Sequence, residues 1–226
     1  MKFCIDDANT EAIRRLCAAY PIDGVTTNPS ILASAKRPPF EVLKEIREII
    51  GYDRDLYVQA ISPDADGMLR EARKITDVLG KDTLVKIPCV TEGFRAMQML
   101  HDEGIRFIGT AVYTPMQGFL AAKCGAEYVA TYVNRIDNMG FDGIRVTKTI
   151  HDMIVRNGYT HSGVLAAALK NSQQVIAVIE YGIKGITVPS AVIDAFCKNT
   201  AIDSAVAKFT EDFEALTAPG ITMETC

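Results

Sequence analysis

Short apolar segments alternate eight times with amphipathic segments along nearly the whole chain of 226 residues. Most of the short segments are apolar at almost every position, which is typical of strands buried on both faces of a parallel sheet. The predicted strands are FCID near residue 3, GVTT near 24, LYVQAI at 56, TLVKIP at 83, FIGTAV at 107, YVATYV at 128, GVLAAAL at 163 and GITVP at 185. This alternation favours a single (β/α)8 TIM barrel, and a doubly wound open sheet of eight parallel strands is the alternative.

The amphipathic segments carry the residues that begin and end helices. Apolar residues recur in them at intervals of three and four, and proline, threonine or glycine marks many of the ends. The predicted helices run over about 13–20, from Pro38 and Pro39 to Gly51, from Pro63 to Gly80, from Thr91 to Gly104, from Thr114 and Pro115 to Gly125, and over 141–157, 171–181, 189–197 and 203–216.

The last of these helices, at about 203–216, follows the final strand and has no later strand to serve. No linker or change in composition divides the chain, so we expect one domain over residues 1–226. The apolar face of the extra helix either packs on a neighbouring subunit or closes its own barrel, and its pattern leaves both open. That face consists of Ala205, Val206, Phe209, Phe213 and Leu216.

Charge and cysteine usage exclude several classes of protein. The chain has 24 Lys and Arg against 28 Asp and Glu, which leaves no basic footprint for nucleic acid or for a membrane surface. Its six cysteines form no C-x-x-C pair, and the N-terminal segment becomes acidic before any apolar signal-peptide core. No stretch of 18 apolar residues is present. We therefore expect a cytoplasmic protein without a membrane span.

The motifs that usually hold a cofactor are missing. Neither G-x-G-x-x-G nor G-x-x-x-x-G-K-[ST] occurs, and the three histidines have no H-E-x-x-H spacing. The sequence therefore predicts neither a nucleotide site nor a metal or Ser–His–Asp hydrolase.

One lysine, Lys86, stands inside the apolar fourth strand. Lysine is almost never fully buried unless it is paired, so one interpretation is a structural ion pair with an interior carboxylate such as Asp6. The other is an amine whose pKa is lowered by desolvation, so that a neutral nucleophile exists near pH 7. Such an amine forms a Schiff base with a ketone or aldehyde and allows C–C cleavage.

Further polar residues follow other strands at their carboxyl ends, where the functional groups of a barrel gather. They are Asp6 after the first strand, Thr26 and Asn28 at the second, Gln59 in the third, Thr110 at the fifth, and Tyr132 and Arg135 at the sixth. Carboxylate, amide, hydroxyl and phenol groups around one lysine predict a site for a polyhydroxylated carbonyl compound.

Several motifs resemble the small transaldolase family, and the fructose-6-phosphate aldolase branch in particular. They are G-V-T-T-N-P-S-I at 24–31, V-K-I-P at 85–88, T-E-G at 91–93, G-T-A-V-Y at 109–113, A-K-C-G-A-E-Y-V at 122–129 and Y-V-N-R-I-D at 132–137. The resemblance implies a (β/α)8 barrel, a class I mechanism with no metal and no organic cofactor, and small sugar and aldehyde substrates. It also implies a homo-oligomer, a pentamer or a decamer of two pentamers, in which the C-terminal helix reaches a neighbour.

The resemblance also implies a role for each polar residue. Lys86 matches the Schiff-base lysine, and Asp6 matches the carboxylate that contacts substrate hydroxyls and assists proton transfer. Thr26 and Asn28 match residues that hold the ketose hydroxyls. Thr110 and Gln59 match the pair that positions a catalytic water, Tyr132 matches the phenol that acts through this water, and Arg135 matches the residue that binds the phosphate of the acceptor.

Position 168 departs from the family pattern. Ala168 stands where a serine usually helps to hold phosphate, and alanine cannot donate a hydrogen bond. The expected activity is reversible cleavage of a ketose or ketose phosphate between C3 and C4, which yields dihydroxyacetone or hydroxyacetone and an aldehyde such as glyceraldehyde 3-phosphate. A transaldolase that passes the same three-carbon unit to a second aldehyde is the main alternative, and a sugar-binding barrel without catalysis is the third.

Overall fold

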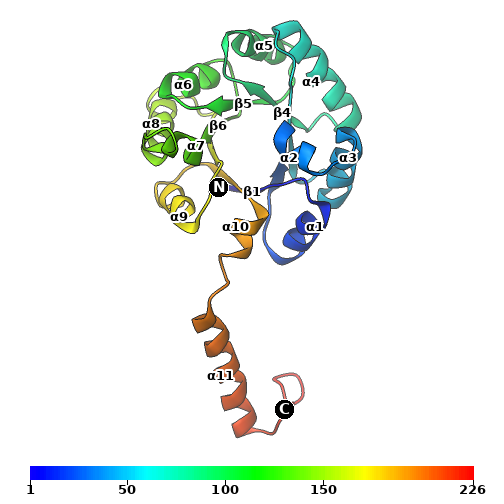
Figure 1. Ribbon diagram of the computed structural model, residues 1–226, viewed down its shortest axis with the longest axis vertical. Coiled ribbons are helices and arrows are strands. Elements are labelled where there is room, and N and C mark those ends of the chain that lie inside the picture. The colour runs from blue at the N-terminus through cyan, green and yellow to red at the C-terminus, as the bar shows by residue number, and fades with distance from the viewer. The chain divides into compact units, whose positions relative to one another are not determined.

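Eight parallel strands close into a barrel in chain order in a computed structural model that describes all 226 residues (Figure 1). The strands are β1 Lys2–Asp6, β2 Gly24–Thr26, β3 Asp55–Gln59, β4 Leu84–Pro88, β5 Phe107–Val112, β6 Tyr128–Tyr132, β7 Val164–Ala167 and β8 Gly185–Val188. The first strand pairs with both the second and the last, which closes the ring. The predicted TIM barrel is confirmed, and the open sheet is wrong.

The interior of the barrel is packed with side chains from alternate strand positions, because successive residues of a strand point to opposite faces. The buried interior cluster consists of Cys4, Tyr57, Leu84, Ile108, Tyr128, Ala130, Tyr132, Leu165 and Ala167. The other strand positions pack on the surrounding helices, so these strands are buried on both faces, as their composition indicated.

Eleven helices accompany the strands, and those within residues 1–192 lie outside the barrel (Figure 1). They are α1 Thr10–Ala19, α2 Pro29–Ser34, α3 Pro39–Ile50, α4 Ala65–Leu79, α5 Thr91–Asp102, α6 Pro115–Lys123, α7 Val133–Asp137, α8 Gly143–Arg156, α9 Ser172–Glu180, α10 Ser190–Asp194 and α11 Thr200–Leu216. Every predicted helix is present with shifted ends. Two were not predicted, α2 and α7, because helices of six and five residues are too short to show a period.

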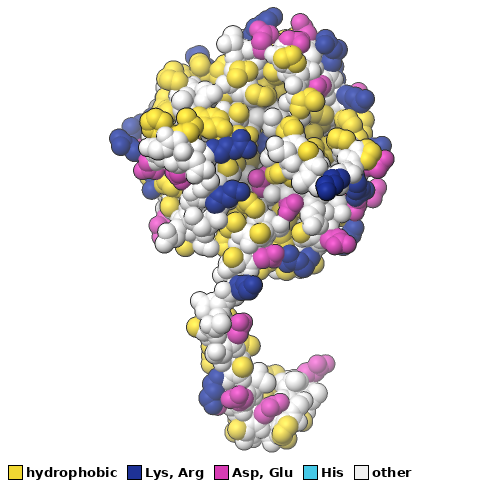
Figure 2. Space-filling view, viewed as in Figure 1, with side chains coloured by type: hydrophobic (Ala, Val, Ile, Leu, Met, Phe, Trp, Pro, Cys, Tyr) yellow, Lys and Arg dark blue, Asp and Glu magenta, His cyan; other side chains and the backbone are white.

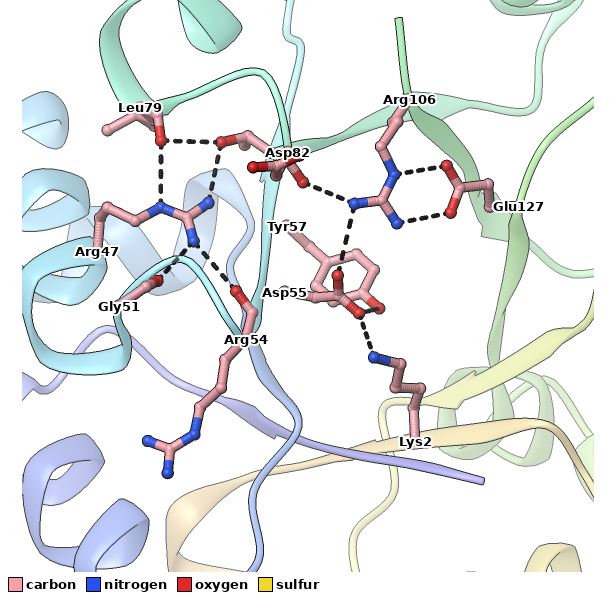
Figure 3. Close-up of polar contacts among 11 residues, drawn as sticks. Lys2, Arg47, Gly51, Arg54, Asp55, Tyr57, Leu79, Asp82, Arg106 and Glu127 are labelled. Atoms are coloured by element: carbon pink, nitrogen blue, oxygen red, sulfur yellow. Dashed lines mark hydrogen bonds and ion pairs between the residues drawn. The ribbon is translucent and has the colours of Figure 1, made fainter.

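The amino-terminal end of the barrel is closed by an ionic network (Figure 3). The Asp55 carboxylate contacts the Lys2 amine at 2.9 Å and the Arg106 guanidinium at 3.6 Å, and Arg106 also binds Glu127 at 2.7 Å. Buried Arg47 donates to the carbonyl oxygens of Leu79, Gly51 and Arg54. These contacts stabilise the end of the barrel that is opposite the usual catalytic face.

The chain forms two compact units, residues 1–192 and 193–226. The second unit contains α11, which begins at residue 200, three residues earlier than predicted, because the Asn199 side chain accepts a hydrogen bond from the Ala201 backbone N–H. No side chain of α11 is buried, and Phe209 and Leu216 are 71% and 80% exposed. No helix of the chain combines the length and apolar character needed to cross a bilayer.

Candidate active site

A cavity of about 170 Å³ lies at the carboxyl-terminal ends of the strands. Six of the predicted site residues line it: Asp6, Asn28, Lys86, Tyr132, Arg135 and Ala168. They come from β1, the segment after β2, β4, β6, α7 and the segment after β7. Residues far apart in sequence therefore meet at the face where barrel enzymes place their catalytic groups.

Lys86 is 4% exposed, and its Nζ donates a hydrogen bond to the Thr27 carbonyl oxygen at 2.8 Å. The structural ion pair with Asp6 is not formed, since the amine contacts this neutral oxygen instead. Burial lowers the pKa of the Lys86 amine, the Asp6 charge opposes this shift, and the Arg135 charge adds to it. The net shift raises the share of the neutral, nucleophilic form of the amine relative to an exposed lysine.

The Asp6 carboxyl is held by hydroxyl groups below the cavity. Its Oδ1 accepts a hydrogen bond from Thr26 at 2.7 Å, and the Thr26 hydroxyl lies 2.6 Å from that of Thr187. Burial raises the pKa of Asp6, while Lys86 and the Thr26 hydrogen bond lower it. A carboxyl placed in this way can exchange a proton with a substrate hydroxyl. Thr187 was not predicted as a site residue, although its polar side chain in the apolar segment GITVP was a usable signal.

The Tyr132 hydroxyl lies 3.1 Å from that of Thr110, so these two predicted residues are brought together. Burial raises the pKa of the Tyr132 phenol, which keeps it protonated and able to donate. The Tyr113 ring meets the Tyr132 ring edge-on at 5.6 Å, and the Arg135 guanidinium lies 4.6 Å from the Tyr132 ring centroid. Tyr113 was not predicted as a site residue, although it ends the quoted motif at 109–113.

Gln59 is the last residue of β3, next to the strand that carries Lys86. It is the partner of Lys86 in the register of β3 and β4, so both side chains belong to the same face of the sheet. Its Oε1 is buried and accepts no hydrogen bond from the protein. Gln59 does not line the catalytic cavity, however, and borders a separate groove between α2, α3 and α4.

Asn28 caps α2, where its Oδ1 accepts from the Ile31 backbone N–H at 3.0 Å. Since the cap uses the oxygen, the amide N–H groups of Asn28 are those that can meet a ligand hydroxyl.

One part of the cavity lining is basic. Arg135 and Lys170 line the cavity together with Ala168, whose backbone is left-handed with φ 55°. Figure 2 shows basic side chains near the centre of the barrel on the face that carries α7. Lys170, Ser30 and Asn134 also line the cavity. Arg135 and Lys170 together provide a place for an anionic group.

No three His, Cys, Asp or Glu side chains come together in a way that could hold a metal ion. The buried Lys86 amine is a group that could hold a carbonyl compound covalently.

A family model described as Transaldolase/Fructose-6-phosphate aldolase matches residues 3–226. The chain belongs to the transaldolase/fructose-6-phosphate aldolase family. As a member, it is an enzyme of the aldolase or transaldolase type, and the resemblance of the motifs to the small transaldolase family is confirmed. Among solved structures, a dihydrodipicolinate synthase from Rhodopseudomonas palustris is similar to this chain with a TM-score of 0.58 and 12% identity. The match covers 96% of this chain and 80% of that one, and at this identity it shows the barrel fold alone.

Proposed function

We propose that the protein is a Schiff-base aldolase that reversibly cleaves a ketose, or a ketose phosphate, between C3 and C4. The products are dihydroxyacetone, or hydroxyacetone from a 1-deoxy ketose, and an aldehyde such as glyceraldehyde 3-phosphate. The observation that carries this proposal is the buried Lys86 amine, whose pKa is lowered by burial, in one small cavity with the Asp6 carboxyl and the Tyr132 hydroxyl. In this proposal, residues 1–226 form a single domain with one active site.

The reaction begins when the neutral Lys86 amine attacks the C2 carbonyl and water leaves, which gives an iminium ion. Asp6 takes the proton of the C4 hydroxyl, the C3–C4 bond breaks, and its electron pair moves into the enamine. The aldehyde leaves. Tyr132, acting through a water held with Thr110 and Gln59, then delivers a proton to C3, and the proton taken up by Asp6 returns through this water to the phenol. Hydrolysis of the resulting iminium ion releases the ketone and restores the amine.

The hydroxyls of the ketose would be held by Asn28 and by the Asp6–Thr26 pair, as the resemblance implies. Arg135, with Lys170 beside it, would bind the anionic tail of the acceptor. Ala168 adds no hydroxyl to this end of the cavity, so the tail depends on the two cations.

Product analysis tests lyase against transferase. We expect fructose 6-phosphate alone to yield free dihydroxyacetone, because the Tyr132 phenol offers a nearby route for protonation of the enamine. The measurement is enzymatic detection of dihydroxyacetone with and without erythrose 4-phosphate. Cleavage that depends strictly on the second aldehyde would instead identify a transaldolase, and a barrel that forms no borohydride-trappable adduct with any ketose would not be an enzyme of this class.

We also propose that the chain forms a homo-oligomer, a pentamer or a decamer, in which α11 packs on a neighbouring subunit. Most of the stability of a helix in a protein comes from packing of its apolar face, and α11, a helix of 17 residues, exposes that face. The residues of that face include Ile202, Val206, Phe209 and Leu216. Six cysteines without a disulfide fit the cytoplasmic location that we propose.

Phe209→Asp should break this assembly. Burying a phenylalanine contributes about 1.5–3 kcal/mol, so each subunit contact should weaken by about 10- to 100-fold. Light scattering should show the parent as an oligomer and the variant shifted toward the monomer mass of 24.7 kDa. Glu211→Gln, on an exposed charged position of the same helix, should keep the mass of the parent. A parent that is already monomeric would contradict the assembly.

A further inference from the structure

A glutamine outside the cavity, Gln174 in the first turn of α9, connects the two segments that carry the basic side chains of the cavity. Its Oε1 accepts from the Lys170 backbone N–H at 2.8 Å. Its Nε2 donates to Asp137 Oδ2 at 2.7 Å and to Asn134 Oδ1 at 3.4 Å. Asn134 and Asp137 belong to α7, the helix that also carries Arg135. One side chain therefore joins the segment of Lys170 to the helix of Arg135.

The contacts of Asp137 show that this link is anchored. The Oδ1 atom of Asp137 accepts from the Gly143 backbone N–H at 2.8 Å, where α8 begins. Its Oδ2 atom is thereby left for Gln174, and the two oxygens of the carboxylate have different partners. The Asn134 backbone N–H donates to the Ala168 carbonyl oxygen at 3.3 Å, which is a second and longer contact between the same two segments.

We propose that Gln174 is a positioning residue that holds Lys170 and Arg135 at the spacing needed for an anionic tail, and that it thereby sets the preference for phosphorylated aldehydes. The proposal rests on the function proposed above and extends it to the selection of the substrate. Gln174 itself does not line the cavity.

Capping of α9 alone does not explain the contacts of the Gln174 side chain. Asn171 already caps α9, since its Oδ1 accepts from the Gln174 backbone N–H at 2.9 Å. The Gln174 side-chain oxygen adds to this cap, but its amide N–H groups point to α7 and serve no helix end. A glutamate would keep the acceptor for Lys170 and lose the donors for Asp137 and Asn134.

The two cations depend on such support because both are exposed at the surface. An exposed lysine loses conformational freedom when it binds an anion, and a backbone that is already held reduces this cost. Ala168 supplies no hydroxyl to the anionic tail of the aldehyde. The affinity for this tail therefore depends more strongly on the spacing of Lys170 and Arg135.

Three variants distinguish a positioning role of Gln174 from a role in capping α9 and from an effect of added charge. Gln174→Met removes all three hydrogen bonds without adding charge, and Gln174→Glu keeps the cap but places a carboxylate against Asp137. The double variant Gln174→Glu with Asp137→Asn reverses the direction of the hydrogen bond and keeps the total charge of the parent. In it, the introduced amide can donate to the introduced carboxylate and still accept from the Gly143 backbone N–H. Gln173→Met, on an exposed position of the same helix, is the matched control.

The first readout is the Kd of glycerol 3-phosphate, an unreactive analogue of the tailed aldehyde, by calorimetry. We expect Gln174→Met and Gln174→Glu each to raise it about tenfold, and the double variant to return to within about threefold of the parent. The second readout is aldol addition of dihydroxyacetone, where the loss in kcat/KM should be at least about fivefold larger for glyceraldehyde 3-phosphate than for glyceraldehyde. This loss should lie in KM rather than in kcat.

Equal losses for tailed and tail-free aldehydes would overturn the proposal, and so would a double variant that binds glycerol 3-phosphate as weakly as Gln174→Glu. These outcomes are distinct from failure of the proposed function. A parent that forms no borohydride-trappable adduct with dihydroxyacetone at Lys86 contradicts the aldolase, whereas the calorimetric comparison of the variants still decides the role of Gln174.

Discussion

Lys86→Arg should abolish covalent capture of a ketose, although it keeps the positive charge. A guanidinium is not deprotonated at working pH and is no nucleophile, so no Schiff base can form. Turnover should fall by about 10⁴-fold or more, as it does when the nucleophile of a covalent mechanism is removed. Borohydride reduction in the presence of dihydroxyacetone, followed by mass spectrometry of the peptides, should show the added mass at Lys86 in the parent and nowhere in the variant.

The matched control is Lys184→Arg, at the amino-terminal end of β8, where the lysine lies over the Tyr128 ring. It should keep the adduct. An adduct at another lysine, or normal turnover of Lys86→Arg, would contradict the assignment. The pH dependence offers a second check: burial lowers the pKa of Lys86, so the trapping rate should fall as the pH drops through that lowered pKa and the amine becomes protonated.

Tyr132→Phe should lower the release of free dihydroxyacetone by roughly 10²–10⁴-fold, the range for loss of a general acid. The Tyr132 phenol, 3.1 Å from the Thr110 hydroxyl, is the proton donor in the route proposed for protonation of the enamine. Assays of dihydroxyacetone from fructose 6-phosphate measure the effect. The Lys86 adduct should still form, because Schiff-base formation needs the amine and not the phenol.

Adding Gln59→Glu to Tyr132→Phe should raise the ratio of transfer to release when erythrose 4-phosphate is present. Without the phenol, protonation of the enamine is slow, which gives the enamine time to meet a second aldehyde. Tyr128→Phe removes a phenol from the same strand at the other end of the barrel and should leave the release unchanged. If the double variant still released dihydroxyacetone at the rate of the parent, this proton route would be wrong.

The strands could be predicted from the sequence because their signal is local. Burial on both faces requires apolar residues at successive positions, and a lysine among them at Lys86 is therefore conspicuous in a single chain. Asp6 and Tyr132 were found in the same way, at the carboxyl ends of apolar strands. The short helices α2 and α7 were missed because five or six residues do not complete two turns, yet their first residues form part of the site.

By itself, the sequence determined the order of strands and helices, the lysine and the polar strand ends, because each depends on the solvation of a residue and its near neighbours. The tertiary structure decided what depends on distant partners. The sequence also allowed an open sheet, and the pairing of β1 with β8 closes the strands into a barrel instead. The Lys86 amine met the Thr27 carbonyl rather than Asp6, and Gln174 came to bridge α7 and the segment of Lys170. Such contacts depend on distances of a few ångströms between segments far apart in the chain, which no local pattern of residues encodes.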